Sequence, residues 1–175
     1  MSSIEIRFSG SGGQGLITAA RILAGALTGE GRHVARSQSY EPVSRGGLSR
    51  SDLVVSDDGA DFPLSTRLKY LLILDAAAAN ASDGLLDCDS EVLVDAELVP
   101  NPPAGDFRVH SLPFTDTARR LGNKRVANIV ALGALAAQSG LIAPDVIRRA
   151  VEAASPKRFQ RLNLEALEAG QQMIG

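Results

Sequence analysis

A glycine pattern near the start of the chain is its clearest candidate for chemistry. The spacing G-x-G-x-x-G, with one additional glycine inside it, is formed by Gly10, Gly12, Gly13 and Gly15. Glycine accepts positive φ angles and lets a ligand approach backbone N–H groups closely. Such a turn suits an anionic group, and phosphate above all, when a strand precedes it and a helix follows it.

Both flanks of the glycine pattern have the required character. Residues 4–8 form a short apolar run that predicts a strand, and residues 16–28 are good helix formers. A helix that begins near Gln14 directs free N–H groups and its positive dipole end toward an anion. Two interpretations follow. The turn contacts an anion or a partner, as its context favours, or its glycines only let the helix pack closely on the strand.

A second candidate anion site is the segment Ser44, Arg45, Gly46 and Gly47. An arginine beside two glycines offers a fixed charge with open backbone around it, which suits phosphate or carboxylate. The alternative is an ordinary glycine turn with an exposed arginine.

The second predicted strand, residues 33–37, ends without an acidic residue nearby. NAD-binding domains usually carry an acid there to hold the ribose hydroxyls, so this ending counts against NAD. Arg36 fits the ribose phosphate of NADP or coenzyme A, or it is a solvated surface residue.

No catalytic residue and no metal site are expected in this chain. It has no Ser-His-Asp order, and His33 and His110 lie in different segments. Cys88 is the single cysteine, which excludes an internal disulfide and an iron–sulfur cluster held by this chain alone. Asp75 and Asp95 end predicted strands, and we expect them to cap the helices that follow.

The size and composition predict one compact domain over residues 1–175. The chain has 45% hydrophobic and 22% charged residues, which are ordinary values for a globular protein. Its net charge of −2 gives no case for binding nucleic acid or an anionic membrane. No apolar stretch is long enough to span a bilayer, and the N-terminus lacks the pattern of a signal peptide, so we expect a cytoplasmic location.

Strands alternate with helices over the first two thirds of the chain. The apolar runs 70–74 and 91–95 are each followed or closed by an acid, a pattern typical of central parallel strands. Residues 48–56 predict a strand reached after a loop, an arrangement that allows an antiparallel orientation, and 107–112 predict a last short strand. Helices are expected at residues 115–121, 126–139, 144–154 and 158–174.

These elements predict an open, mostly parallel Rossmann-like α/β sheet with helices on both faces and a helical C-terminal third. Ligands of such sheets bind beyond the carboxyl ends of the strands. The glycine turn, residues 37–47 and Asp75 all follow strands, so we expect them to converge at one edge.

Three segments taken together resemble the gamma subunit of the 2-oxoacid:ferredoxin oxidoreductases. They are residues 10–15, residues 40–52 and residues 128–135, and the resemblance covers nearly the whole chain. The pairing of G-x-G-G-Q-G with R-G-G, about thirty residues apart, is fairly specific. One departure is visible, because many members have Gly-Pro-Glu after the tyrosine, where this chain has Glu41-Pro42-Val43.

The resemblance implies a subunit of an assembly that oxidatively decarboxylates a 2-oxoacid to an acyl-CoA, with ferredoxin or NAD as acceptor. Thiamine diphosphate, Mg and iron–sulfur clusters would be held by alpha and beta (thiamine-binding) subunits and an iron–sulfur subunit, and none by this chain alone. The gamma chain would help form the coenzyme A site at the subunit interface. The residues carried over to that site are Gly10, Gly12, Gly13, Gln14, Gly15, Tyr40, Ser44, Arg45, Gly46 and Gly47.

Two other functions are left open by the sequence. The glycine turn and Arg36 allow a stand-alone NADP-binding Rossmann-like domain. A purely architectural assembly subunit is also allowed, with glycines that serve close packing only. Pyruvate, 2-oxoglutarate and aryl-substituted 2-oxoacids are all compatible with the sequence as substrates of the assembly.

Overall fold

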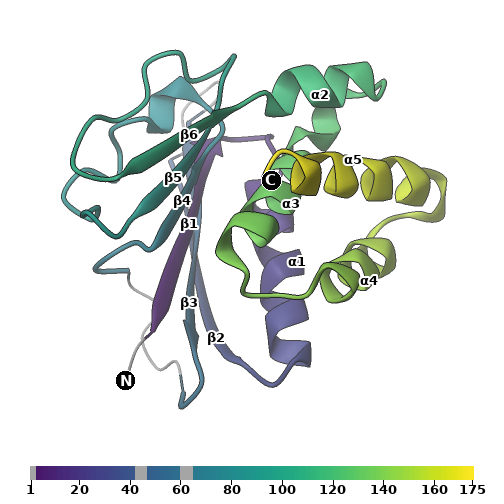
Figure 1. Cartoon of the computed structure of the whole chain (residues 1–175), viewed down its shortest axis with the longest axis horizontal. Helices are drawn as coiled ribbons and strands as arrows, with labels where there is room; N and C mark the ends of the chain where they lie inside the picture. Colours follow the sequence, from purple (N-terminus) through teal and green to yellow (C-terminus); the bar gives the residue numbers. More distant parts are fainter. Residues whose placement is uncertain (1–2, 42–46, 60–64) are drawn as a thin grey trace.

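The computed structural model describes residues 3–41, 47–59 and 65–175. Within these residues six strands form one open sheet in the order β2-β3-β1-β4-β5-β6, and helices pack against it (Figure 1). The strands are β1 (Ile4–Ser11), β2 (His33–Tyr40), β3 (Leu48–Ser56), β4 (Tyr70–Ile73), β5 (Glu91–Asp95) and β6 (Arg108–Leu112). The α-helices are α1 (Leu16–Gly29), α2 (Phe114–Arg120), α3 (Ala127–Ser139), α4 (Pro144–Ala154) and α5 (Gln160–Gln172). Short 3-10 helices are η1 (Ala76–Ala78), η2 (Lys124–Val126) and η3 (Lys157–Phe159).

The strand directions confirm the predicted fold class, an open and mostly parallel α/β sheet with a helical C-terminal third. Strands β1, β4, β5 and β6 pair in parallel, and β3 is antiparallel to both β1 and β2. Because β3 runs against both of its neighbours, β2 points in the same direction as β1. The carboxyl ends of β1, β2, β4, β5 and β6 therefore lie at one edge of the sheet, and β3 begins at the same edge.

Two strands extend further toward this edge than the sequence predicts. β1 continues through Gly10 to Ser11, and β2 continues to Tyr40. Pairing with β3 explains both extensions, because Ser49 lies opposite Gly10 on one side and opposite Tyr40 on the other. Ladder hydrogen bonds to a central strand offset the weak strand propensity of serine and glycine.

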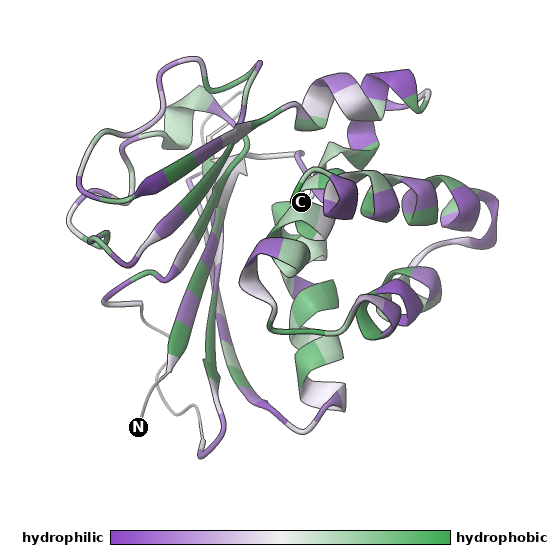
Figure 2. Cartoon of the chain, viewed as in Figure 1, coloured by the Kyte–Doolittle hydropathy of each residue, from purple (hydrophilic) through white to green (hydrophobic). Residues whose placement is uncertain are grey.

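The main core lies between one face of the sheet and the helices. Alternate strand residues such as Ile6, Phe8, Leu72 and Leu93 are fully buried there against α1 and α3. In Figure 2 the helices α1 and α3 next to the sheet are coloured largely hydrophobic, whereas α4 and α5 carry more hydrophilic residues. The helix α3 is buried on nearly all sides, from Asn128 to Ala136, because it lies between the sheet and α5. No helix in the described residues is both long and apolar enough to cross a bilayer.

The opposite face of the sheet is covered very differently. A smaller apolar cluster there joins β4 and β5 to η1, and η1 is the one helical element that this face carries among the described residues. Over β1 and β3 the same face is polar, with a buried ion pair between Arg7 and Asp52. The Nε and Nη2 atoms of Arg7 donate hydrogen bonds to the two carboxylate oxygens of Asp52, each at 2.8 Å. Of the helices expected on both faces, nearly all lie on one.

Two glycines let the backbones of α3 and α5 come into direct contact. A Cβ atom at Gly133 would collide with the carbonyl oxygen of Leu167, and one at Gly170 would collide with the carbonyl oxygen of Val130. Backbone carbonyls cannot rotate aside as flexible side chains do, so the two helices would have to move apart. This contact holds the C-terminal helix against the centre of the molecule.

We expect Gly170→Ala to lower the free energy of unfolding by about 1–3 kcal/mol, because the added methyl overpacks the α3–α5 contact. Gly25→Ala in α1 is the matched control. Nothing lies within 4 Å of its Cβ position, so the higher helix propensity of alanine should stabilise the protein by about 0.5–1 kcal/mol. Urea unfolding of the two variants measures both effects. Equal stability of the two would contradict this account of the helix contact.

Candidate functional site

The glycine turn connects the end of β1 to the start of α1 over residues 12–15. Gly13 and Gly15 have positive φ angles of 88° and 75°, which favour glycine over any residue with a side chain. Gly15 is the N-cap of α1 and supplies no side-chain cap, and the first turn of α1 contains no acidic residue. The helix therefore presents N–H groups that its own sequence leaves without a side-chain acceptor.

Three of the four glycines are required by neighbouring side chains. A Cβ at Gly10 would collide with the Gln14 side chain, and one at Gly15 would collide with the Asn128 side chain. At Gly12 the Cβ position is 2.7 Å from a ring carbon of Tyr40. Gly13 differs from these, because nothing lies within 4 Å of its Cβ position. Of the two interpretations of the turn, close packing accounts for Gly10, Gly12 and Gly15, and open backbone remains at Gly13.

The side chain of Gln14 fastens the turn to the sheet. Its Oε1 accepts a hydrogen bond from the backbone N–H of Ser11 at 2.8 Å, and its Nε2 donates to the carbonyl of Leu74 at 2.8 Å. One amide thus joins the end of β1 to the residue that follows β4. Asn128 adds a second fastening, since its Nδ2 donates to the carbonyl of Gly15 at 3.1 Å.

The structure places Gly47, the last residue of the second candidate segment, at the same edge of the sheet as the glycine turn. The backbone N–H of Gly12 donates to the carbonyl of Gly47 at 3.0 Å. Tyr40, at the end of β2, lies against Gly12 and is still 54% exposed. Ser44, Arg45 and Gly46 lie outside the described residues.

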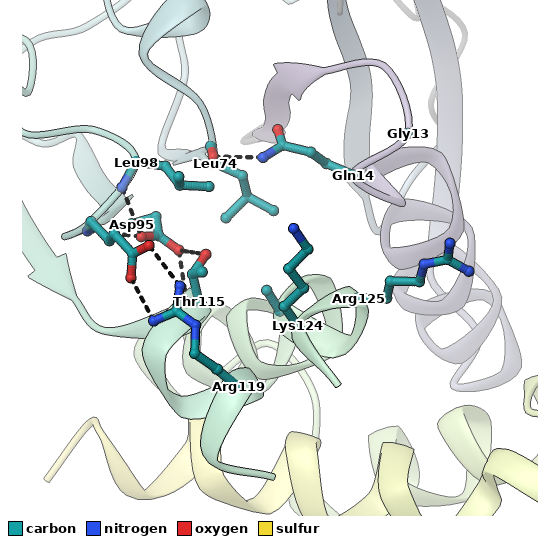
Figure 3. Close-up of a pocket in the computed structure, with 11 residues that line it drawn as sticks. Gly13, Gln14, Leu74, Asp95, Leu98, Thr115, Arg119, Lys124 and Arg125 are labelled. Atoms are coloured by element: carbon teal, nitrogen blue, oxygen red, sulfur yellow. Dashed lines mark hydrogen bonds and ion pairs between the residues drawn. The ribbon is translucent and has the colours of Figure 1, made fainter. Parts of the chain in front are cut away.

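A cavity of about 280 Å³ lies beside the turn at this edge. Gly13, Gln14 and Leu74 line one side, and Figure 3 shows Leu98, Thr115, Arg119 and Lys124 around the remainder. These residues come from the segments that follow β1, β4, β5 and β6 and from η2. The convergence expected at the carboxyl ends of the strands is therefore present as a pocket with polar and apolar walls.

Of the two strand-ending aspartates, Asp75 caps a helix as predicted, whereas a turn and no helix follows Asp95. Asp75 accepts a hydrogen bond from the Ala77 N–H at 2.9 Å, which caps η1. Asp95 is fully buried, and its carboxylate accepts from three backbone N–H groups and from the Thr115 hydroxyl, at 2.6–3.1 Å. With all of its acceptor positions engaged in this way, Asp95 is a structural residue of the pocket wall.

The basic residues of the pocket differ in their partners. Arg119 donates two hydrogen bonds to the Glu97 carboxylate, at 2.7 and 3.1 Å, and this contact lowers the pKa of Glu97. The side chain of Lys124 makes no hydrogen bond or ion pair with any residue that the structure describes, although its backbone carbonyl accepts a hydrogen bond from the Ala127 N–H. Lys124 and Arg125 are neighbours in the sequence just before α3, and the structure shows that they line the same pocket as Gly13 and Gln14 of the glycine turn.

The possible metal ligands lie elsewhere. In the described part of the chain one group of three His, Cys, Asp or Glu side chains is close enough to share an ion, namely Asp87, Cys88 and Asp89. They precede β5, at the opposite end of the sheet, and Arg67 forms ion pairs with both acids. His33 and His110 are on β2 and β6, the two outer strands.

Comparison with known proteins identifies the family. Residues 5–173 match the family model described as pyruvate ferredoxin/flavodoxin oxidoreductase. The chain belongs to this family. Subunit KorC of the 2-oxoglutarate synthase of Archaeoglobus fulgidus is 40% identical to it over 173 residues, which are 97% of this chain and 87% of that protein.

Solved structures agree with this assignment. The gamma subunit of the keto/oxoacid ferredoxin oxidoreductase from Geobacter sulfurreducens has a TM-score of 0.85 and 37% identity, with 97% of this chain and 96% of that chain covered. The fold also matches 31% of a chain of the 2-oxoglutarate:ferredoxin oxidoreductase from Magnetococcus marinus, at a TM-score of 0.88, 19% identity and 99% coverage of this chain. This chain is therefore a gamma subunit of a 2-oxoacid:ferredoxin oxidoreductase, as its motifs indicated, and part of a multisubunit complex.

The amide of Gln14 gives the gamma subunit a testable structural requirement. We expect Gln14→Met to lower the free energy of unfolding by about 1–3 kcal/mol, because it leaves the Ser11 N–H and the Leu74 carbonyl without partners. Urea unfolding measures the loss, and hydrogen exchange should become faster at the Ser11 amide. Gln172→Met, at an exposed position on α5, is the control and should change stability by less than about 0.5 kcal/mol. Unchanged exchange at Ser11 would show that Gln14 does not hold the turn.

Proposed function

We propose that this gamma subunit contributes its glycine turn to the coenzyme A site of the assembled oxidoreductase, at the interface with the thiamine-binding subunits. The observation that carries the proposal is the hydrogen bond between Gly12 and Gly47 at the carboxyl edge of the sheet. It joins the turn with the open backbone of Gly13 to the segment that begins with Ser44 and Arg45. Gly47, the last residue of the second anion candidate, is thereby held next to the first.

Coenzyme A fits the chemistry of this surface. It carries a diphosphate and a ribose phosphate, and backbone N–H groups at a helix start bind such groups well. The positive end of the α1 dipole favours the same charge, and no acidic residue in the first turn of α1 opposes it. An arginine in the adjoining loop would add charge-assisted hydrogen bonds. The gamma subunit would then orient the thiol carrier while its cofactor-bearing partners perform the reaction.

The remaining cofactors are assigned to other subunits. The acids that line the pocket within the described residues are both engaged, Asp95 in four hydrogen bonds and Glu97 with Arg119. This pocket wall offers no free carboxylate for Mg and no cysteine for an iron–sulfur cluster. Alpha and beta subunits would bind thiamine diphosphate with Mg, and a further subunit would hold the clusters. By similarity to the 40% identical KorC, 2-oxoglutarate is the proposed oxoacid.

A purely architectural role is the second candidate. The side chains that occupy the Cβ positions of Gly10, Gly12 and Gly15 favour it, since these glycines have structural reasons to be present. The geometry of Gly13 is the observation that distinguishes the two candidate functions. Its positive φ and the open space around it give the turn an exposed backbone that internal packing does not require.

We expect Arg45→Ala in the native complex to raise the KM for coenzyme A about tenfold or more, because one charged hydrogen bond to phosphate is lost. The KM for 2-oxoglutarate should stay within about twofold, since the oxoacid binds before the thiol carrier is needed. Steady-state assays with each substrate varied in turn measure both constants. Arg148→Ala, at an exposed position on α4, is the charge-matched control.

Equal increases in both constants, or none, would contradict the assigned contact. A complex that keeps its full affinity for coenzyme A after this change would favour the architectural role. Assays with pyruvate in place of 2-oxoglutarate test the proposed oxoacid separately, and faster turnover of pyruvate would overturn it.

A further inference from the structure

The pocket beside the glycine turn contains one ammonium group whose charge has no bonded partner. Figure 3 shows the Lys124 side chain directed toward Gln14 and Leu74, across the pocket from the turn. Lys124 lies in η2, directly before α3, and its side chain makes no hydrogen bond or ion pair with a described residue. An exposed lysine usually points into solvent, whereas this one points along the wall of a cavity.

The other charges around this pocket are compensated or directed elsewhere. Asp95 is saturated by backbone and hydroxyl donors, and the Glu97 carboxylate is held by the fork of Arg119. The Arg119 hydrogen bonds are the main cause that lowers the pKa of Glu97, and the charge of Lys124 lowers it further by a smaller amount. The guanidinium of Arg125 points away from the other labelled side chains. Lys124 therefore supplies the charge that an incoming ligand would meet.

The pocket has room for part of a ligand and offers it two kinds of contact. Its volume of about 280 Å³ is close to the lower end for small-molecule sites, which run from about 300 to 1,000 Å³. Leu74 and Leu98 form an apolar section of the pocket wall. Gly13 lines the same pocket with its open backbone. A ligand with an anionic group joined to a less polar chain satisfies all three features.

We infer that Lys124 binds a phosphate group of coenzyme A, as a second phosphate position across the pocket from the glycine turn. The inference rests on the proposed function and adds a binding residue that lies outside both glycine segments. Coenzyme A carries three phosphates, more than the N–H groups of one turn can engage. A lysine ammonium is a compact point charge suited to phosphate. No carboxylate among the described residues forms an ion pair with Lys124.

The test compares Lys124→Met with Lys124→Arg in the native complex. Methionine keeps the length and the apolar stem of the side chain and removes the charge, so the KM for coenzyme A should rise about tenfold. Arginine keeps the charge and should recover most of the affinity. Lys157→Met, on η3 and away from the pocket, removes the same charge and should leave the KM unchanged. The KM for the oxoacid should stay constant in all three variants.

The salt dependence provides a second readout. Raising the ionic strength should weaken coenzyme A binding less in Lys124→Met than in the wild type, because one ion contact is missing. The Lys124 side chain makes no internal hydrogen bond in the described structure, and its backbone bond to Ala127 is kept in both variants, so the melting temperature of the complex should not change.

Three results would overturn the inference. The first is an unchanged KM for coenzyme A in Lys124→Met while Arg45→Ala raises it, which would leave the proposed function intact. The second is an unchanged KM in both variants, which would remove the proposed function as well. The third is weaker subunit assembly with normal coenzyme A affinity, which would show that Lys124 holds a carboxylate of a neighbouring subunit.

Discussion

The carboxyl edge of the sheet depends on how closely the glycine turn approaches three side chains. Gln14, Tyr40 and Asn128 occupy the spaces that Cβ atoms at Gly10, Gly12 and Gly15 would fill. Their contacts tie the turn to β4, β2 and α3, which are three separate parts of the fold. A turn held in this way keeps the backbone of Gly13 in one orientation. Pre-organisation of this kind is what a binding site needs, because the ligand then does not have to order the loop.

One strand direction accounts for the position of the second glycine segment. In a fully parallel sheet, β3 would begin at the amino edge, and a crossover would have to separate Gly47 from the turn. Because β3 is antiparallel to β1 and β2, the chain reverses at the carboxyl edge and returns directly beside β1. The hydrogen bond from Gly12 to Gly47 is a consequence of this reversal. The reversal therefore brings Gly47 next to a turn that lies about thirty residues earlier in the sequence.

Local patterns were sufficient to predict the fold class, because strand and helix periodicity are properties of neighbouring residues. The helices near 16–28 and 144–154 and the buried strands near 70–74 and 91–95 were recognised in this way. The unequal covering of the two sheet faces could not be predicted, since a 3-10 helix with loops and an α-helix bury apolar residues with similar local composition. At the candidate site, the sequence pattern predicted a glycine turn between a strand and a helix. It did not predict which side chains contact that turn in the fold. The contact between Gly15 and Asn128 joins residues more than a hundred positions apart, and no local rule connects them.

The role of Lys124 shows most clearly why a charge needs its three-dimensional surroundings. In the sequence it is one of several basic residues before a helix, and a solvated surface position is the usual outcome for such a residue. In the fold, Asp95 and Glu97 stand close by and would be expected to pair with it. Both are engaged by other donors, Asp95 by the start of α2 and Glu97 by Arg119. The charge of Lys124 stays available because structural hydrogen bonds occupy the acids around it. The same network that stabilises the segments after β5 and β6 therefore leaves this edge of the sheet receptive to an anion.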